Sequence, residues 1–260
     1  MTGEIKRQAQ LQFGAHAEEY VASPVHSKGY SLGRMIEIIK PDQGWTALDV
    51  ATGGGHTALA LAQAGVQVIA SDLTAPMLHA ARQHIQPQGA ARIVFCAADA
   101  EDLPYPGSTF DCVTCRIAAH HFPNVQAFVR ESARVLKPGG ILAVVDNISS
   151  GEPAIARYYN DFEKLRDPSH NWAYSIDDWD TFFFSEGLKV FHKELVSKEI
   201  DFDVWASRMG VTGSDLVRLR VLLLRAPQQA ASWLQPREKA GRVSFILTEG
   251  IIAGRKPGTI

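Results

Sequence analysis

The chain has 260 residues, of which 46% are hydrophobic and 21% charged, and its formal net charge at pH 7 is -2. This composition is typical of a globular protein with one sizeable core, and the scattered lysines and arginines argue against a surface that binds a nucleic-acid backbone. Because no segment has the length of a transmembrane helix and the N-terminus lacks the form of a secretory signal, we expect a cytoplasmic protein.

The N-terminal stretch through Lys40 is predicted to be helical, and the bulky Phe13, Tyr20 and His26 would cover a cleft. Between residues 45 and 147, short β-rich runs alternate with helical stretches. The runs are almost entirely apolar, as in strands that are buried on both faces of a parallel sheet and joined by right-handed crossovers. The predicted strands are 46–51, 66–71, 92–98, 110–116 and 141–146.

The helix before the fifth strand has the clearest pattern. Its core-facing residues recur at the 3.6-residue spacing of one helix face, and they are Val125, Phe128, Val129, Ser132, Ala133 and Leu136. The sequence KPGG at 137–140 then ends the helix and turns the chain into the strand, since proline fixes φ and glycine permits a positive φ.

After Ser149 the pattern changes. Helices are predicted over 153–166 and 177–186, followed by a strand over 188–200. A helical insertion comes next, and its second part begins with Ser214 as the N-cap. The final strand, 242–255, alternates apolar and polar residues as an edge strand does.

Three cysteines are present, and Cys112 and Cys115 form a C-x-x-C pair. The pair lies inside a predicted strand, where an offset of three residues sends the side chains to opposite faces and separates the Cα atoms by about 10 Å. We therefore predict neither a disulfide nor a metal site, and we interpret these two residues and Cys96 as small buried hydrophobic residues.

The most informative segment is LDVATGGGH, residues 48–56, in which a strand runs into a glycine-rich turn that begins a helix. Gly53 and Gly55 permit tight backbone angles and let a ligand approach the backbone. With Ala58, and with Asp72 about 20 residues on, they also satisfy the loose dinucleotide fingerprint G-x-G-x-x-G/A. The turn alone leaves open a dinucleotide, another nucleoside ligand or a tight turn without a ligand.

Acidic residues follow successive strands. Asp49, Asp72 and Asp99 stand at strand ends, which share one crevice at the carboxyl edge of a parallel sheet. Asp49 would repel a pyrophosphate, whereas S-adenosylmethionine offers an ammonium and a sulfonium near the turn, a ribose diol to Asp72 and an adenine amino group to Asp99. The simpler alternatives are that Asp72 only begins the helix capped by Thr74 and that Asp99 lies in a solvated loop.

Four segments resemble the motifs of class I S-adenosylmethionine-dependent methyltransferases: LDVATGGGH, VIASDLTAPML, DAEDLPYPGSTFDCVTCRIAAHHF and ARVLKPGG. The resemblance covers residues 45–147 and is strongest to the ubiquinone and menaquinone C-methyltransferases and their small-molecule relatives. It implies an α/β, doubly wound, Rossmann-like sheet of seven mostly parallel strands with an antiparallel last strand. The domains would be an N-terminal helical lid (1–44), a cofactor-binding core (45–150) and a C-terminal part (151–260) that completes the sheet and adds a helical substrate lid.

The resemblance also implies which residues bind S-adenosylmethionine: Gly53, Gly55, Asp72, Leu73, Asp99 and Ala100. Asp49 would hold the methionine amino group through water, and Tyr20 of the lid would reach its carboxylate. Leu73 would flank the adenine and Ala100 would offer its backbone N–H. The sequence departs from the quinone enzymes after the fourth strand, so their substrate is not carried over.

The substrate side is predicted from position. His120 and His121 follow the fourth strand, and either could be a general base; the alternative is that they orient the loop. Arg116 would clamp the methionine carboxylate or an anionic acceptor, or else form a surface salt bridge. A group in the C-terminal lid suits an aromatic or amphipathic acceptor: His170, Trp172, Trp205, Arg208 and Met209. The alternative, favoured for any single one of them, is that the Trp and Met residues pack under the lid.

We therefore expect methyl transfer to a small-molecule acceptor by in-line displacement, without a metal and without nucleic acid or a membrane as partner. Two alternatives remain open at this point. One is a nicotinamide-dependent oxidoreductase, which needs a pyrophosphate on the glycine turn. The other is a non-catalytic module that binds S-adenosylmethionine.

Overall fold

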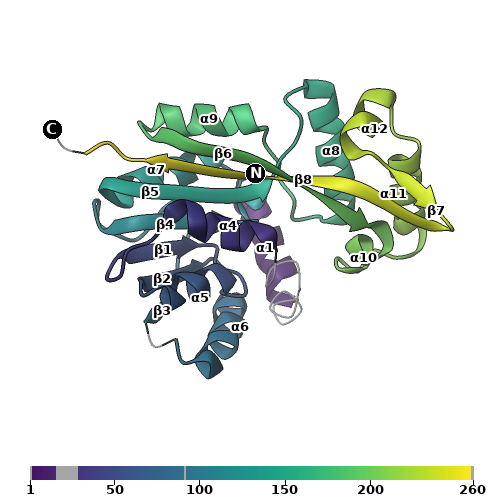
Figure 1. The fold of residues 1–260 in the computed structure, drawn as a ribbon. Helices are drawn as coiled ribbons and strands as arrows, with labels where there is room; N and C mark the ends of the chain where they lie inside the picture. The colour runs from purple at the N-terminus through teal and green to yellow at the C-terminus, as the bar shows by residue number, and fades with distance from the viewer. Residues whose placement is uncertain (1, 16–28, 91, 259–260) are drawn as a thin grey trace.

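The computed structural model describes residues 2–15, 29–90 and 92–258, so Tyr20 and His26 lie outside the described residues (Figure 1). The strands are β1 (Thr46–Val50), β2 (Gln67–Asp72), β3 (Ile93–Ala97), β4 (Phe110–Arg116), β5 (Leu136–Asn147), β6 (Lys189–Asp201), β7 (Arg237–Lys239) and β8 (Arg242–Arg255). The first four match the predicted strands to within one residue at each end. β5 begins earlier than predicted because Leu136 already pairs with Phe110 across a register shift.

The strands form one sheet in the order β3-β2-β1-β4-β5-β8-β6, with β7 paired to β8. β1 to β5 are parallel, and β8 is antiparallel to both β5 and β6. This order confirms the predicted doubly wound α/β class. The strand order reverses between β1 and β4, and ligands of such sheets bind at the carboxyl ends of the strands beside this point.

Helices cover both faces of the sheet. They are α1 (Thr2–Ala15), α4 (Tyr30–Ile39), α5 (His56–Gln63), α6 (Ala75–Ile85), η1 (Gln86–Gln88), η2 (Ala119–His121), α7 (Val125–Val135), α8 (Pro153–Arg166), α9 (Ile176–Ser185), α10 (Phe202–Ser207), α11 (Gly213–Leu224) and α12 (Gln228–Leu234). None of the helices in the described ranges combines the length and the apolarity needed to cross a bilayer.

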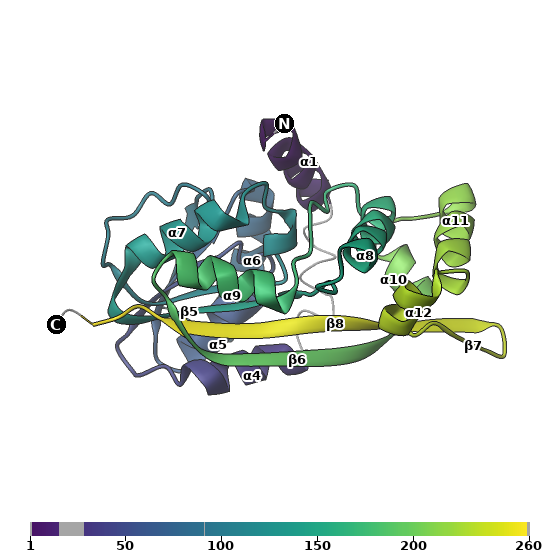
Figure 2. The same ribbon diagram turned by 90° about the horizontal axis from the view of Figure 1, so that it is seen from above.

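Two buried clusters hold the sheet between these helices. Residues of α7 and α9 pack on one face, and residues of α4 and α5 pack on the other, as the view along the sheet shows (Figure 2). Cys115 belongs to the first cluster and Cys112 to the second, which confirms that the pair is split between the faces. Both are buried free thiols, whereas Cys96 is only partly buried, contrary to the prediction.

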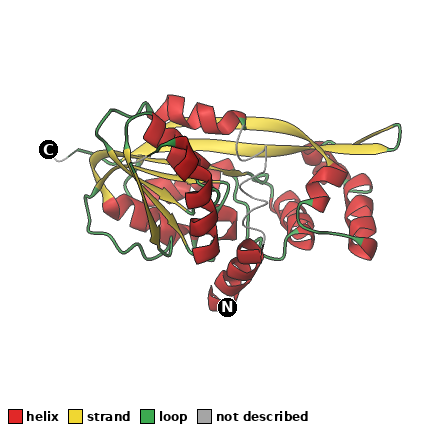
Figure 3. Cartoon of the chain, turned by 90° about the horizontal axis from the view of Figure 1, so that it is seen from below, coloured by secondary structure: helices red, strands yellow, loops and turns green. Residues whose placement is uncertain are grey.

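The C-terminal part is built on the far ends of β6 and β8. These two long strands run past the rest of the sheet, and α8, α10, α11 and α12 gather beside their extension (Figure 3). Val243, Phe245 and Leu247 of β8 are buried against these helices in a third cluster. The chain thus has a second small core, joined to the main one by the same strands.

Two details correct the sequence analysis. β8 was predicted to be an edge strand, but it lies between β5 and β6, and β7 makes eight strands rather than seven. The alternation arises because, in its first half, residues 243, 245 and 247 face the helical cluster while residues 244 and 246 are only partly buried. The N-cap of α11 is Thr212 and not Ser214, because the helix already begins at Gly213.

Candidate active site

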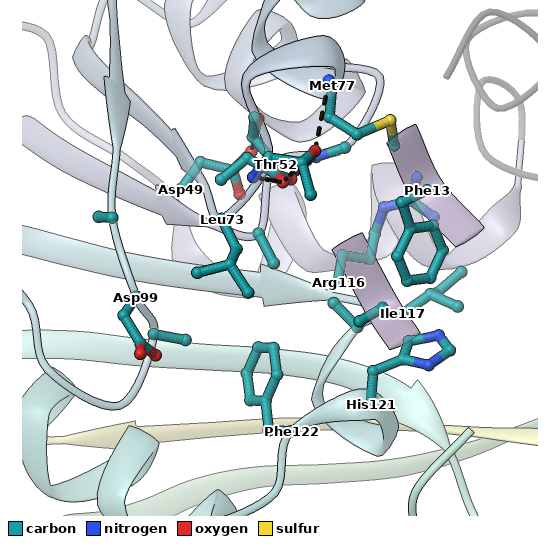
Figure 4. A pocket seen from close by; sticks show the side chains of 18 of the residues that line it. Phe13, Asp49, Thr52, Leu73, Met77, Asp99, Arg116, Ile117, His121 and Phe122 are labelled. Atoms are coloured by element: carbon teal, nitrogen blue, oxygen red, sulfur yellow. Dashed lines mark hydrogen bonds between the residues drawn. The ribbon is translucent and has the colours of Figure 1, made fainter. Parts of the chain in front are cut away.

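A cavity of about 1050 Å³, including its solvent-filled mouth, lies at the carboxyl ends of β1, β2 and β4. Its walls come from the turn after β1, the residues after β2, β3 and β4, and one side of α1 (Figure 4). Eight of the predicted site residues line it: Asp49, Gly53, Asp72, Leu73, Asp99, Ala100, Arg116 and His121.

The glycines of the turn have different roles. Gly53 has φ +53° and lines the cavity, and a Cβ there would meet only Met77 Cε at 3.6 Å. Gly55 has φ +79° and does not line the cavity; a Cβ there would lie 2.6 Å from Ile85 Cδ1. Gly53 therefore leaves room on the ligand side, whereas Gly55 lets α6 pack against the turn.

Asp49 is a buried carboxylate in the wall of the cavity, with 1% of its surface exposed. The hydroxyls of Thr52 and Thr114 donate to its two oxygens over 2.6 and 2.7 Å. Burial raises the pKa of Asp49 to about 6, although these two hydrogen bonds oppose the shift. A buried carboxylate of this kind favours a cationic ligand group and disfavours a phosphate.

Asp72 organises the turn and also lines the cavity. The backbone N–H groups of Gly53 and Thr74 donate to its carboxylate over 3.1 and 3.0 Å, and the Thr74 hydroxyl donates over 3.1 Å. Burial raises the pKa of Asp72 although these backbone bonds lower it. Thr74 caps α6 as predicted, accepting from the backbone of Met77. The helix-start interpretation of Asp72 is thus correct, and it coexists with a place in the cavity wall.

Asp99 is paired with a residue that the sequence did not single out. Lys6 Nζ of α1 lies 2.6 Å from Asp99 Oδ2 and 2.6 Å from Glu101 Oε2. Lys6, Ala9 and Phe13 all belong to the cavity lining, so α1 forms part of its wall. No sequence signal marks Lys6, because its role depends on a contact 93 residues along the chain.

Arg116 lies at the end of β4 and is only 9% exposed, so the alternative of a surface salt bridge is wrong. Its Nε donates to the Thr57 hydroxyl over 3.2 Å. Burial lowers the pKa of Arg116, while the charges of Glu249 and Asp49 act in the opposite direction. The site therefore holds a buried cation close to the carboxylate of Asp49.

The two histidines of η2 occupy different environments. His120 is hydrogen-bonded through Nδ1 and its backbone N–H to Asp146, and its carbonyl accepts from the backbone of Asn171 and Trp172. Burial lowers its pKa, but the charge and hydrogen bond of Asp146, together with the charges of Glu163 and Asp167, make the net shift upward. His120 does not line the cavity. It joins the core to the loop that follows α8.

His121 lines the cavity beside Phe13, whose ring meets the imidazole edge to face at 4.8 Å. Its Nδ1 lies 3.1 Å from the carbonyl oxygen of Ser169. Burial lowers the pKa of His121 to about 4, and the neighbouring charge of His120 adds to the shift. The imidazole is therefore neutral at neutral pH.

None of the five predicted lid residues lines this cavity: His170, Trp172, Trp205, Arg208 and Met209. His170 is buried and bonded through Nε2 to Asn160. Trp205 is 2% exposed and stacks on Phe162 at 4.9 Å, within the third cluster. These observations favour the packing alternative for Trp205, because an aromatic ring in a closed core has no face left for an acceptor.

The chain is similar to known methyltransferases. A family model described as a methyltransferase domain matches residues 48–144. The uncharacterised methyltransferase YcgJ of Bacillus subtilis is 32% identical over 246 residues, which cover 94% of this chain and 97% of that protein. The chain belongs to this methyltransferase family. It is therefore a methyltransferase that uses S-adenosylmethionine, as the sequence resemblance implied.

Two further relatives match this methyltransferase over different lengths of the chain. A crystal structure of a proposed methyltransferase from Bacillus halodurans C-125 is 37% identical, has a TM-score of 0.84, and covers 88% of this chain and 100% of its own. A demethylmenaquinone methyltransferase of Clavibacter sepedonicus is 34% identical over 131 residues, about half of each chain. The first likeness extends over both cores, and the second covers only 50% of this chain.

Proposed function

We propose that the protein transfers the methyl group of S-adenosylmethionine to a small-molecule acceptor that binds in the same cavity. The observation that carries this proposal is the layout of the cavity wall. The buried carboxylates of Asp49 and Asp72 lie at the strand ends. Phe13, Ile117 and His121 lie together at another side of the cavity (Figure 4). A chamber covered by a helix suits a compact acceptor better than a duplex or a folded protein.

The described residues fit the cofactor in three ways. The buried Asp49 is suited to the methionine ammonium, directly or through water. The positively charged Arg116, in the same cavity wall, is suited to the methionine carboxylate. The carboxylate of Asp72 is suited to the ribose diol, with Gly53 leaving room beside it. Leu73 and Ala100, which also line the cavity, would contact the adenine. When bound, the cofactor supplies an electrophilic methyl group on its sulfonium.

The alternative of a nicotinamide oxidoreductase is disfavoured by the same wall. A pyrophosphate on the glycine turn would face the carboxylates of both Asp49 and Asp72, which lie beside Gly53 at the cavity surface. Like charges that are close together in a buried site repel each other strongly.

We assign the base to His121 and a structural role to His120. A carbonyl oxygen can only accept a hydrogen bond, so the contact with Ser169 requires that Nδ1 of His121 carries the hydrogen. Nε2 then keeps its lone pair, on a ring that is neutral and lines the cavity. His120, in contrast, is held by Asp146 and does not reach the cavity.

The acceptor is expected to be neutral and largely apolar or aromatic. Phe13, Met77, Ile117 and Phe122 line the same cavity as His121, and they offer apolar contacts and aromatic faces. Lys6, the cation on the lid side, is already paired with two acids. The names of some relatives refer to demethylmenaquinone, but that match covers only 50% of this chain, so we do not propose a quinone.

The reaction would take place in a reducing compartment, and we propose the cytoplasm. Cys96, Cys112 and Cys115 are free thiols, as is usual for cytosolic proteins.

The proposal is tested with methyl-labelled S-adenosylmethionine and cell extract. The extract is divided into a small-molecule filtrate, a protein fraction and a nucleic-acid fraction, and each is incubated with the purified enzyme. Label is expected in the small-molecule filtrate, and His121→Gln should reduce its rate of incorporation at least about a hundredfold, the usual contribution of a general base. His192→Gln, on strand β6 outside the cavity lining, is the control. Label found in protein or nucleic acid instead would overturn the small-molecule proposal.

A further inference from the structure

The loop after α8 approaches the active site from the C-terminal half of the chain. Asp167 is the C-cap of α8 and Ser169 follows two residues later, and they are only 2% and 1% exposed. Ser169 meets His121 across 48 residues of sequence. Neither residue lines the cavity, so any effect on the reaction has to pass through His121.

Hydrogen bonds connect these three residues in series. The backbone N–H and the hydroxyl of Ser169 both donate to Asp167 Oδ1, over 2.8 and 2.5 Å. The carbonyl of Ser169 accepts from His121 Nδ1 over 3.1 Å, and the Ser169 hydroxyl oxygen lies 3.3 Å from the same nitrogen. The carboxylate of Asp167 thus holds Ser169 in the position that fixes the tautomer of His121.

The charges around His121 come from three elements. His120 of η2 disfavours a second positive charge, whereas Asp146 of β5 and Asp167 of the loop favour one. His170 stays neutral because burial lowers its pKa well below the usual value. Phe13 of α1 contributes no charge. Asp146 is already bonded to His120, so Asp167, which also interacts with the charge of Arg166, is the carboxylate left to balance a proton on His121.

We propose that Asp167 is a positioning residue for methyl transfer: through Ser169 it holds His121 in the Nδ1–H tautomer, and its carboxylate stabilises the imidazolium formed when His121 receives the acceptor's proton. This inference rests on the proposed function. In the step, a lone pair of the acceptor forms the bond to the methyl carbon, the carbon–sulfur electron pair stays on sulfur, and the acceptor's proton passes to Nε2. The net charge is conserved, because the positive charge lost by the sulfonium ends on His121.

Two substitutions separate positioning from charge. Asp167→Ala removes the acceptor for Ser169, so His121 is expected to become a mixture of tautomers. Asp167→Asn keeps an oxygen for Ser169 and is expected to preserve the Nδ1–H tautomer while removing the counter-charge. The matched controls are Asp161→Ala and Asp161→Asn, at an exposed position on α8, the helix that Asp167 caps.

The tautomer is measured by ¹⁵N NMR of histidine-labelled enzyme at pH 7, without any acceptor. In parallel, the rate of label transfer from S-adenosylmethionine into the small-molecule filtrate and the affinity for S-adenosylhomocysteine are measured. Both Asp167 variants should lose rate by at least about tenfold, part of a general base's contribution, with product affinity unchanged. Only Asp167→Ala should change the tautomer.

The possible failures are distinguishable. An unchanged tautomer in Asp167→Ala, with the protein folded, overturns the positioning role and leaves His121 as the base. A changed tautomer without loss of rate overturns the base assignment and with it the role of Asp167. A loss of product affinity equal to the loss of rate would show that Asp167 only supports the fold.

Discussion

Asp49 and Asp72 are two buried carboxylates whose pKa values are raised by burial. Both were selected from the sequence because they stand at strand ends, and both are found in the wall of one cavity. The sequence could not predict that hydroxyls of Thr52 and Thr114 surround Asp49, because Thr114 comes from a strand 65 residues away. The hydrogen bonds from Thr52 and Thr114 favour the ionised form of Asp49, which can bind a cation.

The raised pKa of Asp49 predicts a pH dependence of product binding. The carboxylate is ionised above its pKa of about 6 and protonated below it, so the affinity for the cationic amino group should be constant above that pH. Below it, affinity should fall about tenfold per pH unit as the charge is lost. Calorimetric titration with S-adenosylhomocysteine between pH 5 and pH 8 measures this. Asp49→Asn should bind weakly at every pH, and the same slope in that variant would exclude Asp49 as its origin.

Replacement of Asp72 tests the ribose contact. Asp72→Ala should weaken S-adenosylmethionine by roughly 2 kcal/mol, about thirtyfold, because the diol loses charge-assisted hydrogen bonds. The melting temperature is recorded as well, since Asp72 also accepts bonds from Gly53 and Thr74. Asp177→Ala, on the exposed side of α9, is the control. Equal affinity in both variants would remove Asp72 from the cofactor site.

At the scale of elements, the turn between β1 and α5 was predictable in place but not in the division of labour between its glycines. The pattern LDVATGGGH locates a strand, a tight turn and a helix start, and all three are present. That Gly55 serves packing depends on Ile85 at the far end of α6, which no local pattern reveals. The cap of α6 by Thr74 was predictable, because caps are encoded within a few residues.

The two glycines should therefore fail differently. Gly55→Ala adds a left-handed backbone penalty of about 1–2 kcal/mol and a collision with Ile85, so it should lower the melting temperature strongly. Gly53→Ala carries a similar backbone penalty but has space for the methyl group, so it should mainly weaken S-adenosylhomocysteine. Thermal unfolding and calorimetry on both variants decide this. The reverse order of effects would contradict the assignment.

At the scale of the whole molecule, the parallel half was predictable because its strands are short apolar runs, although a loop and not a helix connects β3 to β4. The C-terminal half was predictable in its helices but not in its contacts. The alternation of β8 indicated an edge, yet the strand is internal, because alternation reports one covered face and says nothing about hydrogen-bonded neighbours. For the lid aromatics the sequence left both a ligand pocket and packing open, and Trp205 packs inside the second core.

This arrangement predicts the effect of Trp205→Ala. Removing an indole that contacts Phe162 and Phe245 leaves a cavity, and the free energy of unfolding should fall by about 3–5 kcal/mol. The affinity for S-adenosylhomocysteine, measured below the melting temperature, should stay within about twofold, well under the 1.4 kcal/mol that corresponds to tenfold. Intact stability with a lost rate of methyl transfer would instead return Trp205 to the acceptor site.

The central claim is that the cofactor lies along the carboxyl edge of the sheet, between the glycine turn and α1. The most direct test is a crystal structure of the enzyme grown with S-adenosylhomocysteine. We predict the ribose hydroxyls within about 3.2 Å of Asp72 and the amino group at Asp49, directly or through one water. A ligand bound outside this cavity, or one in it that touches neither carboxylate, would contradict the account.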